Sequence, residues 1–185
     1  MSLRDHVSDT TDFEIVVSSH VDVESARRHY QELRAACSEL AASELDMVIL
    51  GRSDKGEMRI LRRHEFTATF GTSVGPGWGI AAGLALALFP ASTEGTGFRS
   101  RAAGEEAVLA TTAEVVRSAV GWDQMRQAGA QVEAHPATVV CSVPRSRCGP
   151  LPPGDPEAVT SWFRVGIDLP ATEALIASTY REATT

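Results

Sequence analysis

The sequence predicts an α+β fold, a ferredoxin-like split βαβ sheet with an inserted Gly/Ala-rich helical hairpin and a C-terminal strand–helix extension. Three observations predict it. Strand, helix and strand–strand patterns follow one another in the first third of the chain. A stretch without charged residues, 67–92, then interrupts them. A run rich in β-branched residues, 138–143, resumes the strand pattern after it.

The domain organisation follows from the same patterns. The length of 185 residues fits a single domain. We expect a flexible leader over 1–12 and one α+β domain over 13–143. A Pro-rich loop is predicted over 144–160 and a strand–helix extension over 161–185.

The first elements are a strand and an amphipathic helix. Residues 13–18 alternate in polarity as a half-buried strand does. Asp22 is a suitable N-cap for a helix over 23–42. Apolar residues recur there at spacings of three and four, namely Val23, Ala26, Tyr30, Leu33, Cys37 and Leu40.

A β-hairpin is expected next. The apolar run 45–50 predicts one strand, and 57–63 predicts its partner. Between them, Ser53, Asp54, Lys55 and Gly56 have the composition of a turn.

The inserted hairpin, at about 67–120, is predicted from small residues. Five of them fall every fourth position, namely Gly71, Gly75, Gly79, Gly83 and Ala87. At helical pitch they form one stripe, called the glycine stripe below, which allows another backbone to come close. The first helix is expected at about 75–89 and spans about 21 Å, less than the roughly 30 Å hydrocarbon core of a bilayer. The second helix is expected over 102–120.

The remaining elements are a helix over 123–132, strands over 138–143 and 163–169, and a last helix over 171–183. We expect the helices 23–42 and 123–132 to cover one face of the sheet. The predicted core consists of Phe13, Ile15, Val17, Tyr30, Leu33, Leu40, Met47, Ile49, Ile60 and Val139.

Composition limits the function classes. The net charge of −7 argues against a nucleic-acid partner, because binding to phosphate backbones depends on exposed basic patches. The first twelve residues are polar and do not look like a signal peptide, and three cysteines do not make a disulfide framework. A cytoplasmic protein is therefore expected, with association with a membrane as the alternative.

The segment from Lys55 to Glu65, followed by the glycine-spaced stretch, resembles a bacterial family of predicted membrane proteins that contain a domain of unknown function. Gly56, Arg63, His64 and Glu65 match the family's hairpin motif. The resemblance covers roughly 13–143 and implies a Gly/Ala-rich hydrophobic hairpin, but no reaction.

One set of residues is a candidate ligand site. Arg62, Arg63, His64 and Glu65 would place two guanidinium groups and an imidazole near each other, which suits a carboxylate or a phosphate. No catalytic residue, metal ligand or cofactor is predicted. Cys148 lies close to Arg145 and Arg147 in sequence, and a lowered thiol pKa is one interpretation of that arrangement, with simple loop exposure as the other.

Three functions stay open on the sequence. The first is a non-enzymatic accessory protein that forms a homo-oligomer through the glycine stripe. The second is a membrane-associated protein that inserts 67–92. The third is a ferredoxin-like domain that binds a small ligand or acts on it.

Overall fold

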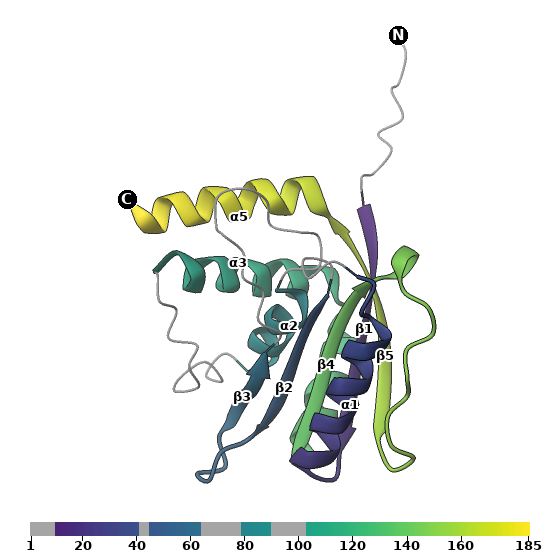
Figure 1. The fold of residues 1–185 in the computed structure, drawn as a ribbon. Coiled ribbons are helices and arrows are strands. Elements are labelled where there is room, and N and C mark those ends of the chain that lie inside the picture. Colours follow the sequence, from purple (N-terminus) through teal and green to yellow (C-terminus); the bar gives the residue numbers. More distant parts are fainter. Residues whose placement is uncertain (1–9, 41–44, 64–78, 90–102) are drawn as a thin grey trace.

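The structure is a computed structural model that describes residues 10–40, 45–63, 79–89 and 103–185, apart from the side chains of 103–106. Its elements are, in chain order, β1 (Thr10–His20), α1 (Val23–Ala36), β2 (Asp46–Arg52), β3 (Met58–Arg63), α2 (Ile80–Leu88), α3 (Ala103–Ala119), α4 (Trp122–Glu133), β4 (Ala137–Pro144), the 3-10 turn η2 (Arg145–Arg147), β5 (Val159–Asp168) and α5 (Leu169–Thr184). The α+β class is confirmed (Figure 1).

The strands form one five-stranded sheet in the order β3-β2-β4-β1-β5, and every neighbouring pair is antiparallel. Both β1 and β2 pair with β4, so they run parallel to each other with β4 between them. The ferredoxin-like arrangement is not confirmed, because β3 extends the sheet beyond β2 and the strand order is 3-2-4-1-5.

The first strand and helix follow the sequence pattern with shifted ends. β1 begins at Thr10, inside the range expected to be a leader, because its pairing with β5 extends to that residue. In α1 the carboxylate of Asp22 accepts a hydrogen bond from the Ser25 amide at 2.7 Å, as an N-cap does. The helix ends at Ala36 rather than at residue 42, because the chain tightens into a turn in which the Ser38 amide donates to the Ala35 carbonyl.

The other boundaries lie close to the predicted ones, with two exceptions. Helix α2 begins at Ile80, and Gly79 before it has a left-handed φ of 75°, so the helix does not pass through Gly79 as expected. The start predicted at residue 75 lies outside the described residues. Strand β5 begins at Val159 and pairs with β1 along its full length, so the predicted extension is an integral part of the sheet.

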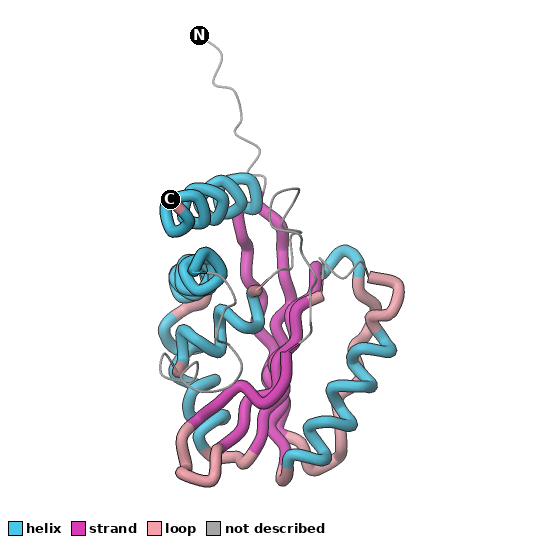
Figure 2. The backbone as a smooth tube through the Cα atoms, turned by 60° about the vertical axis from the view of Figure 1, so that its left-hand side comes forward, coloured by secondary structure: helices cyan, strands magenta, loops and turns pink. Residues whose placement is uncertain are grey.

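Helices cover both faces of the sheet (Figure 2), and a hydrophobic core lies on each face. On one face α1 packs over β4, β1 and β2 through Ala26, Tyr30 and Leu33. The other face is covered by α2, α3 and α4, with α5 packed outside α3. The prediction that α1 and the helix at 123–132 share a face is wrong, because α4 packs in the other core through Met125 and Ala128.

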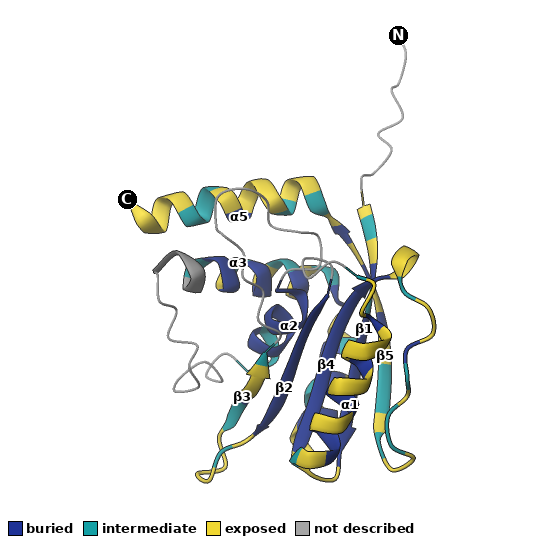
Figure 3. Ribbon diagram, viewed as in Figure 1, coloured by how far each residue is buried: buried dark blue, intermediate teal, exposed yellow. Residues whose placement is uncertain are grey.

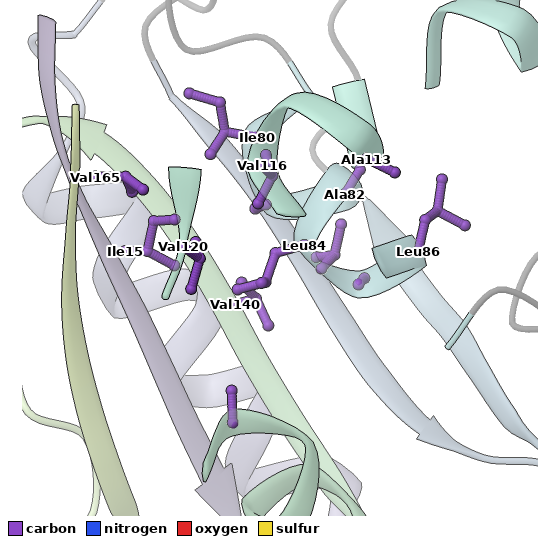
Figure 4. Packing of buried hydrophobic residues seen from close by; sticks show 14 of the residues in the cluster. Ile15, Ile80, Ala82, Leu84, Leu86, Ala113, Val116, Val120, Val140 and Val165 are labelled. Carbon is purple, nitrogen blue, oxygen red and sulfur yellow. The ribbon is translucent and has the colours of Figure 1, made fainter. Parts of the chain in front are cut away.

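Nine of the ten predicted core residues are buried, and Leu40 is partly buried (Figure 3). In the larger core, small and branched side chains of α2 and α3 interdigitate above the sheet (Figure 4). Ile80, Ala82 and Leu84 of α2 lie there beside Val116 of α3. Because this core is built from small residues, α2 and α3 are held close to each other.

Helix α4 is fixed to the sheet by one buried polar side chain. The Gln131 side-chain amide donates to the Val17 carbonyl at 2.9 Å and to the Val159 carbonyl at 2.7 Å. The Gln131 carbonyl oxygen accepts a hydrogen bond from the Ser161 hydroxyl at 2.6 Å. Gln131 therefore satisfies polar groups of two adjacent strands, β1 and β5, at once.

Candidate functional sites

The structure does not bring the two arginines of the predicted ligand site together. They are consecutive residues of β3, so their side chains lie on opposite faces of the sheet. The guanidinium carbon of Arg62 lies 4.8 Å from the centroid of the Tyr30 ring, on the α1 face. The Nε of Arg63 lies 3.9 Å from Asp46 Oδ1, on the α2 face. His64 and Glu65 lie outside the described residues.

The partner of Arg63 is a buried carboxylate. Asp46 opens β2 and is 3% exposed. Its Oδ2 accepts a hydrogen bond from the Ala82 amide in the first turn of α2 at 2.9 Å. A carboxylate is stabilised at a helix N-terminus, where backbone N–H groups are unpaired and the helix dipole is positive. Asp46 thus caps α2 from a distant strand, and no local pattern in the sequence indicated this contact.

The described part of the glycine stripe packs against α3 of the same chain. A Cβ on Gly83 would lie 3.0 Å from Thr112 Cγ2 and 3.2 Å from the Thr112 carbonyl carbon and oxygen. A Cβ on Gly79 would lie 3.5 Å from the same methyl group. Ala87 is partly buried. Gly71 and Gly75 lie outside the described residues. Gly79 and Gly83 therefore serve a close intrachain contact between α2 and α3.

Strand β5 leaves one edge of the sheet open. It pairs with β1 on one side, and no strand in the described part of the chain pairs with its other side. Phe163, Val165 and Ile167 point into the larger core. On the opposite face Trp162 is 43% exposed, whereas Val159, at the start of the strand and on the same face as Phe163, is 47% exposed. Helix α1 packs mainly over β4, β1 and β2, and the segment between η2 and β5 runs beside β5, where the Thr160 hydroxyl donates to the Pro153 carbonyl at 3.2 Å (Figure 1).

A pair of histidines connects β1, α1 and the segment that leads to β5. His29 Nε2 lies 2.9 Å from the Pro152 carbonyl and therefore donates to it, which leaves His29 Nδ1 to accept from His20 Nε2 at 3.1 Å. Both rings are buried. Burial, and after it the neighbouring His29, lower the pKa of His20 to about 4. The scattered positions of the histidines in the sequence gave no sign of this pair.

All three cysteines meet at one place, called the thiol cluster here. Cys37 caps the C-terminus of α1, Cys141 lies in the middle of β4, and Cys148 follows η2. The Cys37 and Cys148 sulfurs are 3.8 Å apart. Cys37 and Cys141 are buried, and Cys148 is partly exposed. All three are free thiols.

The three thiols differ in acidity. Hydrogen bonds from the thiols of Cys141 and Cys148 lower the pKa of Cys37 to about 7. Burial and the neighbouring Cys37 raise the pKa of Cys148 to about 12. The interpretation of Cys148 as an acidic thiol beside two arginines is therefore wrong, and Cys37, which the sequence presented as one more apolar helix position, is the acidic thiol.

The described residues also bear on two other kinds of site, a metal site and a membrane-spanning helix. They contain no group of three His, Cys, Asp or Glu side chains arranged to hold a metal ion. None of the helices described combines the length and the apolar character needed to cross a bilayer. Comparison with known protein families, with curated proteins and with solved structures finds no match for this chain.

Proposed function

We propose that this protein is a non-enzymatic accessory protein that associates with a second copy of itself, and that the edge of β5 is the contact between the copies. The observation that carries the proposal is the open, ten-residue edge strand with exposed apolar side chains. The glycine stripe, from which the sequence predicted self-association, is less suited to this role, because Thr112 of the same chain already covers Gly79 and Gly83.

An uncovered edge strand is a template for pairing with another chain. Its outer N–H and C=O groups lack protein partners, and proteins usually protect such edges with lysine, proline or a bulge. Strand β5 contains neither lysine nor proline, its pairing with β1 shows no register shift, and its charged residues are Arg164 and Asp168. Two copies related by a two-fold axis would pair their β5 strands antiparallel and continue the sheet from one subunit into the other.

The exposed side chains favour the same contact. Trp162 is exposed on one face of β5 and Val159 is exposed on the other face, at the start of the strand. Across a two-fold axis, side chains near the centre of the strand meet their counterparts in the other copy. Burial of an aromatic side chain is a large favourable term in such contacts.

The experiment is a light-scattering mass measurement after gel filtration, over a range of loading concentrations. The wild-type chain is expected at twice the mass of 19.7 kDa. The double variant Val159→Lys/Trp162→Lys is expected at the monomer mass, because it removes an exposed apolar side chain from each face of the strand and the lysines at position 162 of the two copies would meet near the two-fold axis. Leu175→Lys is the matched control, since Leu175 is 49% exposed on α5, away from this edge, and should keep the dimer.

Two results would overturn the proposal. One is a wild-type chain that stays monomeric at every concentration. The other is a dimer that survives the double variant while circular dichroism shows both proteins folded. A chain recovered only in the membrane pellet, and released by detergent but not by salt, would instead support the membrane-associated alternative.

We also infer that the ferredoxin-like plan underlies the sheet once β3 is set aside as an added edge strand. Two features support this. Strands β1 and β2 are parallel with β4 between them, and β4 and β5 are parallel with β1 between them. These are two interleaved split βαβ units. In the second unit, the Pro-rich segment that follows β4 takes the place of a crossover helix.

A further inference from the structure

We propose that Cys37 and Cys148 form a thiol modification site, at which a hydroperoxide converts the two thiols into a reversible intramolecular disulfide. This inference is independent of the proposed association, because the thiol cluster lies beneath α1 rather than on the β5 edge. It starts from the convergence of all three cysteines of the chain at one point.

The geometry places the two sulfurs within reach of each other. They are 3.8 Å apart, and a disulfide bond is about 2.05 Å long, so the sulfurs must approach by roughly 1.8 Å. Cys148 can supply this movement, because the chain from Cys148 to Ala158 contains neither helix nor strand. Cys37 is the C-cap of α1 and lies where regular helical hydrogen bonding ends.

The third cysteine, Cys141, lies in the central strand and is not one of the two reacting thiols. Cys141 is completely buried in β4, the strand at the centre of the sheet, and cannot move without disturbing two strand pairings. Its thiol hydrogen-bonds to Cys37, and this contact helps to lower the Cys37 pKa. We therefore assign Cys141 a positioning role.

The acidities separate the roles of the two reacting thiols. The pKa of Cys37, lowered to about 7 by hydrogen bonds from its two neighbours, makes a substantial part of this group thiolate near neutral pH. The thiolate is the nucleophilic form of cysteine. The pKa of Cys148 is raised to about 12 by burial and by the charge on Cys37, so this thiol keeps its proton and donates to Cys37. Cys148 is also the only one of the three with partial exposure, and its displacement opens the approach to Cys37.

The chemistry balances with a hydroperoxide as the oxidant. The Cys37 thiolate attacks the terminal oxygen of hydrogen peroxide, the O–O bond breaks, and hydroxide leaves, which is protonated to water. Cys37 is then a sulfenic acid. The Cys148 sulfur attacks the Cys37 sulfur, an S–S bond forms, the S–O bond breaks, and the hydroxyl leaves with the Cys148 proton as a second water. Two thiols lose two electrons in all, and a dithiol such as dithiothreitol restores them by exchange and becomes a disulfide itself.

The disulfide would connect the end of α1 to the segment between β4 and β5. It joins residues 111 positions apart in sequence, so it restricts the unfolded chain over a long loop. We expect oxidation to raise the melting temperature by about 5 °C or more and dithiothreitol to reverse the rise.

The test counts thiols in the full chain. The protein is treated with hydrogen peroxide, denatured, alkylated with iodoacetamide, and weighed by mass spectrometry. Three adducts are expected for the reduced chain and one for the oxidised chain, with the remaining adduct on Cys141 after peptide mapping. Three adducts at every peroxide concentration, or a disulfide that includes Cys141, would overturn the proposal without any variant being needed.

Variants sharpen the result. Cys141→Ala keeps both reacting thiols but removes the hydrogen bond that helps to lower the Cys37 pKa, so it is expected to go from two adducts to none more slowly than the wild type at neutral pH. Cys37→Ser and Cys148→Ser are each expected to form no intramolecular disulfide and to show no reversible rise in melting temperature. A reversible rise in either serine variant would count against the assignment, and circular dichroism of the reduced proteins confirms that each variant is folded.

Discussion

At the scale of single residues, two glycines in helices have opposite surroundings, and they give the sharpest test of the α2–α3 contact. We predict that Gly83→Ala lowers the free energy of unfolding by about 1–2 kcal/mol, because the new methyl group would lie 3.0–3.2 Å from the side chain and backbone of Thr112. Helix propensity alone would make Gly83→Ala raise the free energy of unfolding, by up to about 1 kcal/mol. Urea denaturation measures the change.

The matched control is Gly129→Ala in α4. A Cβ there would lie 3.6 Å from a side-chain methyl of Leu88, an ordinary contact, so helix propensity is expected to make this variant neutral or slightly stabilising. Equal effects of both substitutions would mean that α2 and α3 are not closely packed at Thr112. The sequence predicted close approach between this stripe and the second helix of the hairpin or another copy of the chain, but it did not indicate Thr112 as the contact, because Thr112 stands outside any small-residue pattern.

The candidate ligand residues show that nearness in sequence does not by itself place side chains in one site. Arg62 and Arg63 were grouped by their nearness in sequence, yet in a strand consecutive side chains lie on opposite faces. One contacts Tyr30 and the other Asp46. The sequence did not indicate the thiol cluster, because residues that are far apart in the chain can still meet in the fold. Its members are distant in sequence, and only the folded sheet brings Cys37 and Cys148 together.

At the scale of elements, the histidine pair links the Pro-rich segment to α1 and β1, because His29 bonds to both the Pro152 carbonyl and His20. In the folded protein the pKa of His20 is lowered from 6.5 to about 4, first by burial and then by His29. The unfolded chain therefore binds more protons than the folded chain between these two values. The free energy of unfolding should fall as the pH falls from about 6.5 to about 4. Above pH 6.5, His20 is neutral in both states and does not lower the free energy of unfolding.

We predict that His20→Asn makes this pH dependence shallower, by about 1–2 kcal/mol between pH 7 and pH 4.5 after allowance for solvent screening. Asparagine does not titrate, and it is too short to place an N–H where His20 Nε2 lies, so the pH dependence and not the overall stability is compared. Urea denaturation at the two pH values measures the difference. His135→Asn is the control, since His135 is partly exposed and its Nδ1 bonds to the Gln131 carbonyl rather than to a histidine. Parallel pH profiles for His20→Asn and the wild type would contradict the prediction.

The type of each element was predictable, whereas several ends were not. Amphipathic spacing located α1, and alternation located β5, because each has one buried face. The end of α1 was missed, since the apolar spacing continues through Cys37 and Leu40 beyond the last helical turn. There the apolar residues pack from a turn instead of a helix, and periodicity does not distinguish the two.

At the scale of the whole molecule, the strand order and the face that each helix covers were not available from local patterns. Both depend on which strands pair, and the pairings of β1 join residues more than 100 positions apart, as between Val17 and Val140. The outcome is a single sheet whose two faces hold separate cores. Consecutive residues of the central strands serve both cores, as Val16 faces α1 and Val17 faces α4.

Since the two cores share these strands, we predict that the chain unfolds in one cooperative transition. Leu33→Ala removes packing on the α1 face, and Phe163→Ala removes packing on the other face. Each is expected to lower the free energy of unfolding by about 2–5 kcal/mol. Each should also shift the far-ultraviolet circular dichroism and tryptophan fluorescence curves together, because loss of either core exposes one side of the same central strands. A two-step curve for Leu33→Ala, with the later step unchanged from the wild type, would show instead that the sheet and the α2–α5 layer remain folded without α1.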